Sequence, residues 1–211
     1  MNEYFGNLNV LPTSKVIKDM RKYVETNKIP VINDEALLFF LHLLDVLKPK
    51  RILEIGTAIG FWAINIATYD EEVLIDTIEK SEFMFSEASK NIRKAKLIER
   101  INVFLGDALE FELDKLSSEY DIIFIDASKA QYIKFFEKYE HLLTPDGVII
   151  SDNLLFHGFV NNSKMIESKN LRHLVEKVEA YNNFLARNRN YDTKFFAIGD
   201  GIAVSRKVKR R

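Results

Sequence analysis

The chain has 211 residues, a mass of 24.5 kDa and a formal net charge of -1, and 47% of its residues are hydrophobic. These values are typical of one globular domain with a substantial core, and they give no overall electric field that would attract nucleic acid. Cysteine is absent, which excludes disulfides, thiolate metal sites and cysteine nucleophiles.

Two amphipathic helices are predicted before the first strand, over residues 13–26 and 34–47, with Asn33 or Asp34 as the N-cap of the second. Four basic residues gather in the first of them: Lys15, Lys18, Arg21 and Lys22. They favour either a solvated helix face or a surface for an anionic partner, and the basic run at 206–211 allows the same two interpretations. No stretch is typical of a signal peptide or of a membrane span, so we expect a cytoplasmic protein with no membrane partner.

From residue 50 onward, short apolar runs alternate with helical stretches. The runs are rich in Ile, Val, Leu and Phe, as in strands covered on both faces, and lie at 51–55, 73–78, 101–105, 121–126 and 147–151. Helices are predicted between them, at 60–68, 81–96, 108–116 and 129–143. This alternation indicates βαβ units with right-handed crossovers, and therefore a parallel sheet.

The alternation ends near the C-terminus. A long polar helix is predicted over 163–189, and strands at 193–198 and 202–205 flank Gly199-Asp200-Gly201, which is typical of a tight antiparallel hairpin. We therefore expect an α/β fold with a mostly parallel seven-stranded sheet that ends in an antiparallel hairpin. We expect a single domain, with N-terminal helices over 1–49, the core over 50–206 and a basic tail over 207–211.

Oxygen-bearing side chains follow the fourth and fifth predicted strands. Asp126 ends one run, and Asp152 and Asn153 end the next. If the strands are parallel neighbours, these residues meet at the sheet edge where ligands of open α/β sheets bind, and three hard oxygen donors suit Mg²⁺. Lys129 lies one helical turn beyond Asp126. Each Asp alone could form an Asx turn or cap a helix, but the combination favours a catalytic site.

The first predicted strand ends in a glycine turn. Glu54, Gly56 and Gly60 give the spacing E-x-G-x-x-x-G, which differs from the G-x-G-x-x-G of dinucleotide-binding folds. Gly56 permits a sharp turn and close approach of a ligand to the backbone, and Gly60 opens the next helix. In the first of several βαβ units, this turn favours a nucleoside-type ligand.

Two further acids follow the second and third strands. Glu79 could accept both hydroxyls of a ribose, or it could oppose the dipole of the helix that follows. Asp107 and the backbone amide of Ala108 could contact an adenine edge, or Asp107 could cap a short helix. The sequence leaves both alternatives open.

Taken together, these motifs resemble those of class I S-adenosylmethionine-dependent O-methyltransferases of the catechol and caffeoyl-CoA type, and more narrowly the bacterial tRNA 5-hydroxyuridine methyltransferases. The resemblance covers nearly the whole chain, through residues 29–31, 51–60, 79, 106–108, 124–132, 149–156 and 198–205. It implies a Rossmann-like class I methyltransferase fold and a homodimer. It is specific for a metal-dependent O-methyltransferase and less specific for an RNA substrate.

The resemblance also implies a role for each site residue. The residues that would bind S-adenosylmethionine are Val31, Glu54, Gly56, Gly60, Glu79, Asp107, Ala108 and Asp126. A divalent metal, Mg²⁺ or Mn²⁺, would be held by Asp126, Asp152 and Asn153, and Lys129 would be the general base. Trp62 departs from the family, because relatives tend to have Ser there, whose hydroxyl meets the cofactor carboxylate. Trp62 offers its backbone or indole N–H instead.

The function that the resemblance implies is methylation of 5-hydroxyuridine at the tRNA wobble position, which gives 5-methoxyuridine. Basic residues and four aromatic side chains that could stack on an unpaired base favour tRNA as the partner: Phe61, Trp62, Phe156 and Phe159. The alternative is a small-molecule enzyme of the catechol or caffeoyl-CoA type. A catechol presents two adjacent oxygens, as 5-hydroxyuracil does with its 5-hydroxyl and 4-carbonyl. A non-catalytic nucleotide- or RNA-binding module ranks behind both.

Overall fold

The computed structural model describes residues 3–162 and 166–208. The chain divides into two compact units between Leu116 and Ser117, and each is treated by itself below. The single-domain organisation expected from the sequence stays a prediction, and residues 209–211 of the basic tail lie outside the described part. Within that part, every helix is too short or too polar to cross a membrane.

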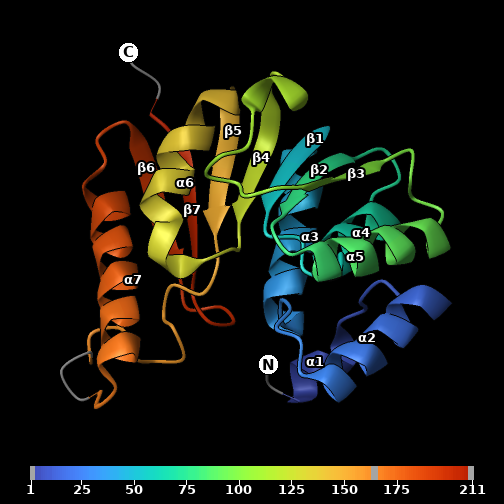
Figure 1. Cartoon of the computed structure of the whole chain (residues 1–211), viewed down its shortest axis with the longest axis horizontal. Coiled ribbons are helices and arrows are strands. Elements are labelled where there is room, and N and C mark those ends of the chain that lie inside the picture. Colours follow the sequence, from blue (N-terminus) through green and yellow to red (C-terminus); the bar gives the residue numbers. More distant parts are fainter. Residues whose placement is uncertain (1–2, 163–165, 209–211) are drawn as a thin grey trace. The chain divides into compact units, whose positions relative to one another are not determined.

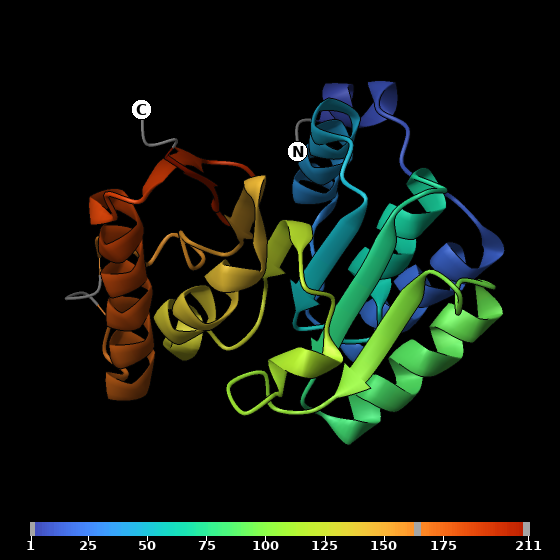
Figure 2. The ribbon, with the colours of Figure 1, turned by 90° about the horizontal axis from the view of Figure 1, so that it is seen from above.

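The first unit combines helices with three strands (Figures 1 and 2). In chain order its elements are α1 (Glu3–Leu8), α2 (Lys15–Asn27), α3 (Asp34–Leu47), β1 (Arg51–Ile55), α4 (Phe61–Tyr69), β2 (Leu74–Glu79), α5 (Glu82–Lys94), β3 (Ile101–Leu105) and the 3-10 turn η1 (Leu113–Lys115). The sequence did not predict α1. It predicted a helix over 108–116, but the structure forms only η1 there, and the ring of Phe111 packs edge-on against Phe104 at 5.5 Å.

Side-chain caps fix where the first helices begin. Ser14 accepts a hydrogen bond from the backbone N–H of Ile17 and starts α2, and Asn33 accepts one from Ala36 and starts α3. Each cap satisfies an N–H group that lacks a partner inside its helix. The caps confirm the prediction of Asn33 and place both helices within two residues of their expected bounds.

The three strands of this unit are parallel, in the order β3-β2-β1. Ile55 pairs with Ile78, and Glu79 pairs with Leu105, so all three strands end at the same edge. Helices α4 and α5 pack on the sheet, and four of the five residues of β1 are buried. The loops that carry Gly56, Glu79 and Asp107 therefore leave from one edge, as the sequence predicted.

The second unit contains four strands and two longer helices. Its elements are β4 (Tyr120–Ile125), the 3-10 turn η2 (Lys129–Gln131), α6 (Tyr132–Tyr139), the 3-10 turn η3 (Glu140–Leu142), β5 (Leu143–Ser151), α7 (Lys169–Arg187), β6 (Tyr191–Phe196) and β7 (Ile202–Lys207). Their order is β4-β5-β7-β6, with β4 and β5 parallel and β7 antiparallel to both of its neighbours. The predicted C-terminal hairpin is confirmed.

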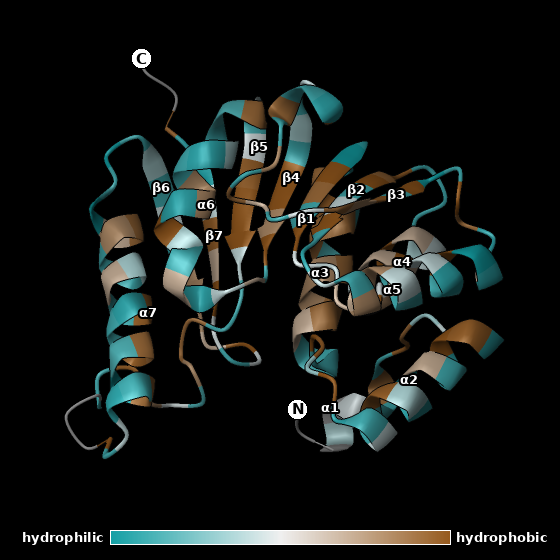
Figure 3. Cartoon of the chain, in the orientation of Figure 1, coloured by the Kyte–Doolittle hydropathy of each residue, from teal (hydrophilic) through white to brown (hydrophobic). Residues whose placement is uncertain are grey.

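Register brings three chain segments together at one edge of the strands of this unit. Ile125 pairs with Ser151, and Ser151 pairs with Ala203. The residues that follow β4, the residues that follow β5 and the Gly199–Gly201 turn before β7 are therefore neighbours. Figure 3 shows β4 and β5 as largely hydrophobic, whereas α7 alternates hydrophobic and polar residues and buries Val175, Val178, Tyr181 and Leu185.

Candidate active site

The loop between β1 and α4 passes repeatedly through left-handed backbone conformations. The φ angles are +105° at Gly56, +47° at Ala58 and +79° at Gly60. Gly60 donates to the carbonyl of Thr57 at 2.8 Å, which closes the turn directly before α4. A left-handed conformation costs an alanine about 1 kcal/mol, and such strain persists where the surroundings fix the backbone.

Glu79 is the group that fixes this loop. One carboxylate oxygen accepts the backbone N–H of Ala58 at 2.8 Å, and the other accepts that of Ser81 at 2.8 Å. The carboxylate thus joins the glycine loop to the start of α5. Each oxygen retains a second lone pair. The orientation therefore fits a carboxylate that accepts ribose hydroxyls. This role is compatible with the other one considered from the sequence, in which Glu79 opposes the dipole of α5.

Glu54 lies beneath the same loop and is 1% exposed. Its carboxylate accepts the hydroxyl of Thr77 at 2.5 Å, and Thr77 lies 2.6 Å from the hydroxyl of Thr57. This buried chain of hydrogen bonds joins β1, β2 and the glycine loop. In the structure Glu54 supports the glycine loop through Thr77 and Thr57. Its contribution to the methionine end of a cofactor pocket stays a prediction.

Asp107 is engaged by its neighbours at the end of β3. One oxygen accepts the backbone N–H of Leu109 at 2.9 Å, and the other lies 2.7 Å from the exposed ammonium group of Lys80. Ala108 is 8% exposed. The first contact shows that Asp107 stabilises a turn, whereas contact of Asp107 or Ala108 with adenine stays a prediction.

A hollow of about 570 Å³ lies beside α4 in the first unit. Its lining includes Val31, Phe61 and Arg21. Arg21 lies 5.2 Å from the centre of the Phe61 ring and pairs with Asp34 at 2.7 Å. Val31 therefore borders a hollow at the start of α4, and its closure over a bound cofactor stays a prediction.

Trp62 directs its indole into the interior of the first unit. The side chain is 4% exposed, and its ring meets Phe40 edge-on at 5.4 Å. Of the two donors considered from the sequence, the backbone N–H in the first turn of α4 is therefore the one suited to an incoming carboxylate. Among the described residues no side chain caps this helix, whose N-terminal end attracts anions.

Replacing Trp62 with serine, the residue that relatives tend to have, should destabilise the protein rather than improve the cofactor pocket. Loss of a buried indole leaves a cavity beside Phe40, and such changes cost about 3–5 kcal/mol. Chemical denaturation of the wild type and the Trp62→Ser variant measures the difference. An unchanged free energy of unfolding would contradict the packing role.

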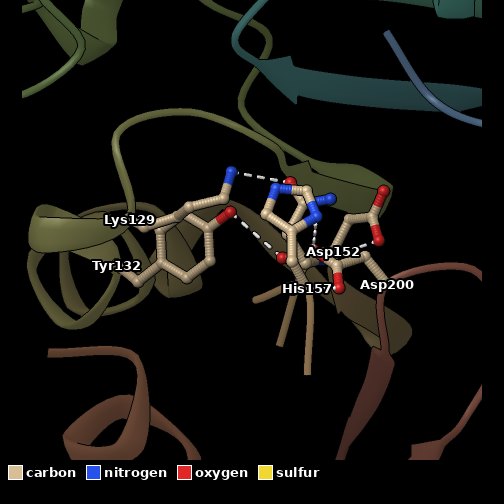
Figure 4. Close-up of polar contacts among 6 residues, drawn as sticks. Lys129, Tyr132, Asp152, His157 and Asp200 are labelled. Atoms are coloured by element: carbon tan, nitrogen blue, oxygen red, sulfur yellow. Dashed lines mark hydrogen bonds and ion pairs between the residues drawn. The ribbon is translucent and has the colours of Figure 1, made fainter. Parts of the chain in front are cut away.

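The other four predicted site residues, Asp126, Lys129, Asp152 and Asn153, follow the carboxyl ends of β4 and β5 in the second unit. Figure 4 shows Lys129 and Asp152. Lys129 donates from Nζ to Oδ1 of Asn153 at 2.7 Å. The backbone N–H of Asn153 donates to Oδ1 of Asp152 at 2.6 Å, and Asn153 is left-handed with φ +61°. The short turn after β5 therefore directs Asn153 toward Lys129.

The carboxyl groups of this cluster have unusual electrostatics. Burial, together with the charge of Asp126, raises the pKa of Asp152 to about 7. Burial also raises the pKa of Asp126, although the ammonium group of Lys129 opposes that shift. A buried carboxyl beside a partly buried one, with repulsion between their charges, is typical of a site that receives a cation.

The donor atoms of this cluster suit a divalent metal. Two carboxylates and one amide oxygen are hard ligands that suit Mg²⁺ or Mn²⁺, and a cation would offset the repulsion between Asp126 and Asp152. The described residues contain no group of three or more His, Cys, Asp or Glu placed to hold a metal. Three protein donors would leave coordination positions of Mg²⁺ to water and substrate. The residues fit, and the metal assignment stays a prediction.

Sequence analysis missed two residues of this neighbourhood. Tyr132 is 1% exposed and donates its hydroxyl to the backbone carbonyl of Asp152 at 3.1 Å. Asp200, assigned only to a hairpin turn, raises the pKa of Asp152 through its charge. Both residues lie within stretches that carry the family resemblance, but nothing in the hairpin pattern indicated that Asp200 approaches this cluster.

Comparison with known proteins identifies the family to which the chain belongs. A family model described as O-methyltransferase matches residues 10–208. A Staphylococcus aureus structure, provisionally assigned as a caffeoyl-CoA O-methyltransferase, is 38% identical with a TM-score of 0.88 and 93% of each chain covered. Caffeoyl-CoA O-methyltransferase from Stellaria longipes is 24% identical, covering 99% of this chain and 90% of the relative.

An O-methyltransferase from Bacillus cereus, solved with S-adenosylhomocysteine (SAH), is 24% identical with a TM-score of 0.81, covering 98% of this chain and 96% of that one. At this identity it supports the fold alone. The Staphylococcus aureus likeness confirms the expected fold class, a Rossmann-like class I methyltransferase fold with seven mostly parallel strands and an antiparallel end hairpin. The chain belongs to the O-methyltransferase family.

Proposed function

We propose that the protein transfers a methyl group from S-adenosylmethionine to the hydroxyl of an acceptor that carries two adjacent oxygens. The observation that carries this proposal is the cluster at the ends of β4 and β5. There, Lys129 Nζ lies 2.7 Å from Asn153 Oδ1, beside the buried carboxyl of Asp152 and the partly buried carboxyl of Asp126. Such a cluster combines a proton acceptor with ligands for a cation.

The first unit supports S-adenosylmethionine as the donor. The carboxylate of Glu79 is oriented by two backbone N–H groups and retains lone pairs for a ribose. The uncapped start of α4 suits the methionine carboxylate. The Bacillus cereus relative was solved with SAH, the demethylated form of this donor.

The chemistry assigned to the second unit is proton removal and orientation. A neutral hydroxyl is a poor nucleophile, and a divalent cation held by Asp126, Asp152 and Asn153 would lower its pKa. Lys129, once unprotonated, would accept the hydroxyl proton at Nζ. Holding the acceptor oxygen in line with the methyl–sulfur bond would supply much of the remaining acceleration.

The acceptor that we propose is 5-hydroxyuridine at the wobble position of tRNA. Its 5-hydroxyl and 4-carbonyl are adjacent oxygens. Exposed cations are present for a phosphate backbone: Lys15, Lys18 and Lys22 on α2, and Arg187 and Arg189 around the end of α7. Of the four aromatic side chains expected to stack on a base, Phe61, Trp62 and Phe156 are buried, and Phe159 is 37% exposed.

A small phenol of the catechol or caffeoyl-CoA type is the second candidate. It is favoured by the relatives, because both the Stellaria longipes protein and the Staphylococcus aureus structure carry a caffeoyl-CoA assignment. A catechol presents two vicinal oxygens to the same cluster. The catalytic residues therefore suit either acceptor, and the residues around them must discriminate.

The deciding experiment measures methyl transfer from labelled S-adenosylmethionine with Mg²⁺. The acceptors are tRNA that carries 5-hydroxyuridine, the same tRNA with unmodified uridine, a catechol and caffeoyl-CoA. We expect labelling of the hydroxylated tRNA that stops when the metal is chelated, and none of the unmodified tRNA. Labelling of the phenols alone would replace the acceptor and keep the chemistry. Absence of transfer to every acceptor would refute the proposal.

A further inference from the structure

The loop that follows Asn153 holds an uncommon run of left-handed residues. The φ angles are +46° at Phe156, +56° at His157 and +79° at Gly158. For residues other than glycine such conformations cost roughly 1–3 kcal/mol each, and they persist only where other contacts determine the backbone. The strain lies directly after a predicted metal ligand, and strained backbone of this kind clusters at functional sites.

The hairpin between β6 and β7 holds this loop from one side. The N–H groups of Leu154 and Leu155 donate to the carbonyls of Gly201 and Asp200, at 2.9 and 2.8 Å. The backbone N–H of His157 donates to Oδ1 of Asp200 at 2.6 Å. Gly201 must stay without a side chain, because a Cβ there would lie 2.7 Å from Leu155.

Helix α7 holds the loop from the other side. Asn182 donates to the carbonyl of Leu154 at 2.9 Å. Phe156 is buried in a cluster with Val175 and Val178. The backbone around His157 is thus anchored on both sides, by hydrogen bonds to the hairpin and by apolar packing on the helix.

This well-held backbone presents an exposed imidazole. The His157 side chain is 74% exposed, and Nδ1 lies 3.7 Å from Oδ2 of Asp200. Asp200 itself is 15% exposed, and its Oδ2 atom is buried without a hydrogen-bond partner among the described residues. A buried carboxylate oxygen without a donor is costly. A small rotation that brings Nδ1–H onto Oδ2 would satisfy it and would fix the ring.

His157 also belongs to the surroundings of the catalytic cluster. Asp200, which holds His157, is close enough to Asp152 for its charge to raise that pKa. In the view of Figure 4 the imidazole stands between the ammonium group of Lys129 and the carboxylate of Asp200. Leu155 and Phe159, 41% and 37% exposed, flank it along the chain and give the loop an apolar surface.

We propose that His157, oriented by Asp200, is a binding residue for the acceptor ring. With Nδ1–H directed to Asp200, the outer nitrogen Nε2 and the flat face of the imidazole are presented to a planar acceptor that carries polar groups on its edge. Asp200 is a positioning residue that acts through His157. This inference rests on the proposed function, because it names the residue that contacts the substrate of that reaction.

The test compares His157→Ala with His173→Ala, a matched control. His173 on α7 is also exposed, at 70%, and lies 3.7 Å from a carboxylate oxygen of Glu176. We expect His157→Ala to raise KM for the methylated acceptor by about tenfold, the scale of one lost hydrogen bond or ring contact. Its kcat should change less than KM, and its affinity for SAH should not change. His173→Ala should match the wild type in all three.

The role of Asp200 is tested by Asp200→Asn, alone and combined with His157→Ala. The single variant should raise KM for the acceptor by several-fold, and the double variant should match His157→Ala, because a residue that acts only through His157 adds nothing once His157 is absent. A further rise in KM in the double variant would refute the positioning role.

Two failures can be told apart. If the wild type binds SAH but methylates neither the tRNA nor the phenols, the proposed function fails and this inference falls with it. If the wild type methylates an acceptor and His157→Ala has the same KM as His173→Ala, the inference alone is refuted. A loss of SAH affinity in His157→Ala would also refute it, because the effect would then not be confined to the acceptor.

Discussion

Replacing Lys129 with alanine should lower turnover by about 10²–10⁴-fold, the usual contribution of a positioned general base. Affinity for SAH should stay unchanged, because Lys129 is not among the residues expected to bind the donor. Lys129 Nζ now donates to Asn153 at 2.7 Å, so the substitution also removes a hydrogen bond from a predicted metal ligand. The experiment must therefore separate the two losses.

Lys129→Arg makes that separation. Arginine can donate to the Asn153 amide, but it stays protonated near neutral pH and cannot accept a proton. If Lys129 is the base, Lys129→Arg and Lys129→Ala should lose similar turnover. Lys134→Ala, a change of an exposed lysine on α6, serves as the control. Near-normal turnover in Lys129→Arg would instead assign Lys129 to the orientation of Asn153, and near-normal turnover in Lys129→Ala would remove it from the mechanism.

The parts of the fold that follow from local patterns were predictable. The strands at Arg51–Ile55 and Ile101–Leu105 match their expected bounds, because continuous apolar runs between turn residues leave few alternatives. Strand β5 was predicted to begin at 147 but begins at Leu143. The Thr144-Pro145-Asp146-Gly147 stretch has the composition of a turn. The structure continues the strand through it with a shift in register, and Gly147 admits the carbonyl of Asp121, which would lie 2.8 Å from an added Cβ.

Some features of the candidate site were likewise predictable from the sequence, and others were not. Asp126, Asp152 and Asn153 were placed together on the expectation that two consecutive strands are parallel neighbours, and β4 and β5 do pair in parallel. The burial of Trp62 against Phe40 and the contact between Asp200 and His157 were not predictable. Each depends on how distant segments pack, and a one-residue motif does not reveal which way its side chain points.

In the absence of divalent cations, the Asp152 carboxyl should make the protein less stable as pH rises. The pKa of Asp152 is about 7 in the folded chain and about 3.9 in an unfolded one. Below both values neither state carries the charge. Between them the unfolded state loses its proton first, so stability falls as pH rises from about 4 to about 7. The full penalty, on the order of 4 kcal/mol, remains at higher pH.

The Asp152→Asn variant removes this titration and keeps an oxygen for the N–H of Asn153. With EDTA at pH 8 the variant should therefore melt at a higher temperature than the wild type, and at pH 4 the difference should nearly vanish. Thermal unfolding across this pH range measures both. If the wild type is as stable as the variant at pH 8, the ionised Asp152 carboxylate does not destabilise the fold and the prediction is wrong.

Added Mg²⁺ should close much of the stability gap between the wild type and the variant at pH 8. A cation that binds only the folded wild type at 100 times its dissociation constant stabilises it by about 2.7 kcal/mol, whereas the variant has lost a charged ligand and should respond weakly. At pH 5 protonation of Asp152 competes with the metal, so the wild type should respond less than at pH 8. A Mg²⁺ response that is equal in both proteins, or equal at both pH values, would show that Asp152 does not bind the ion. Methyl transfer should follow the same pattern, because the carboxylate that destabilises the metal-free fold is the one that we expect the reaction to use.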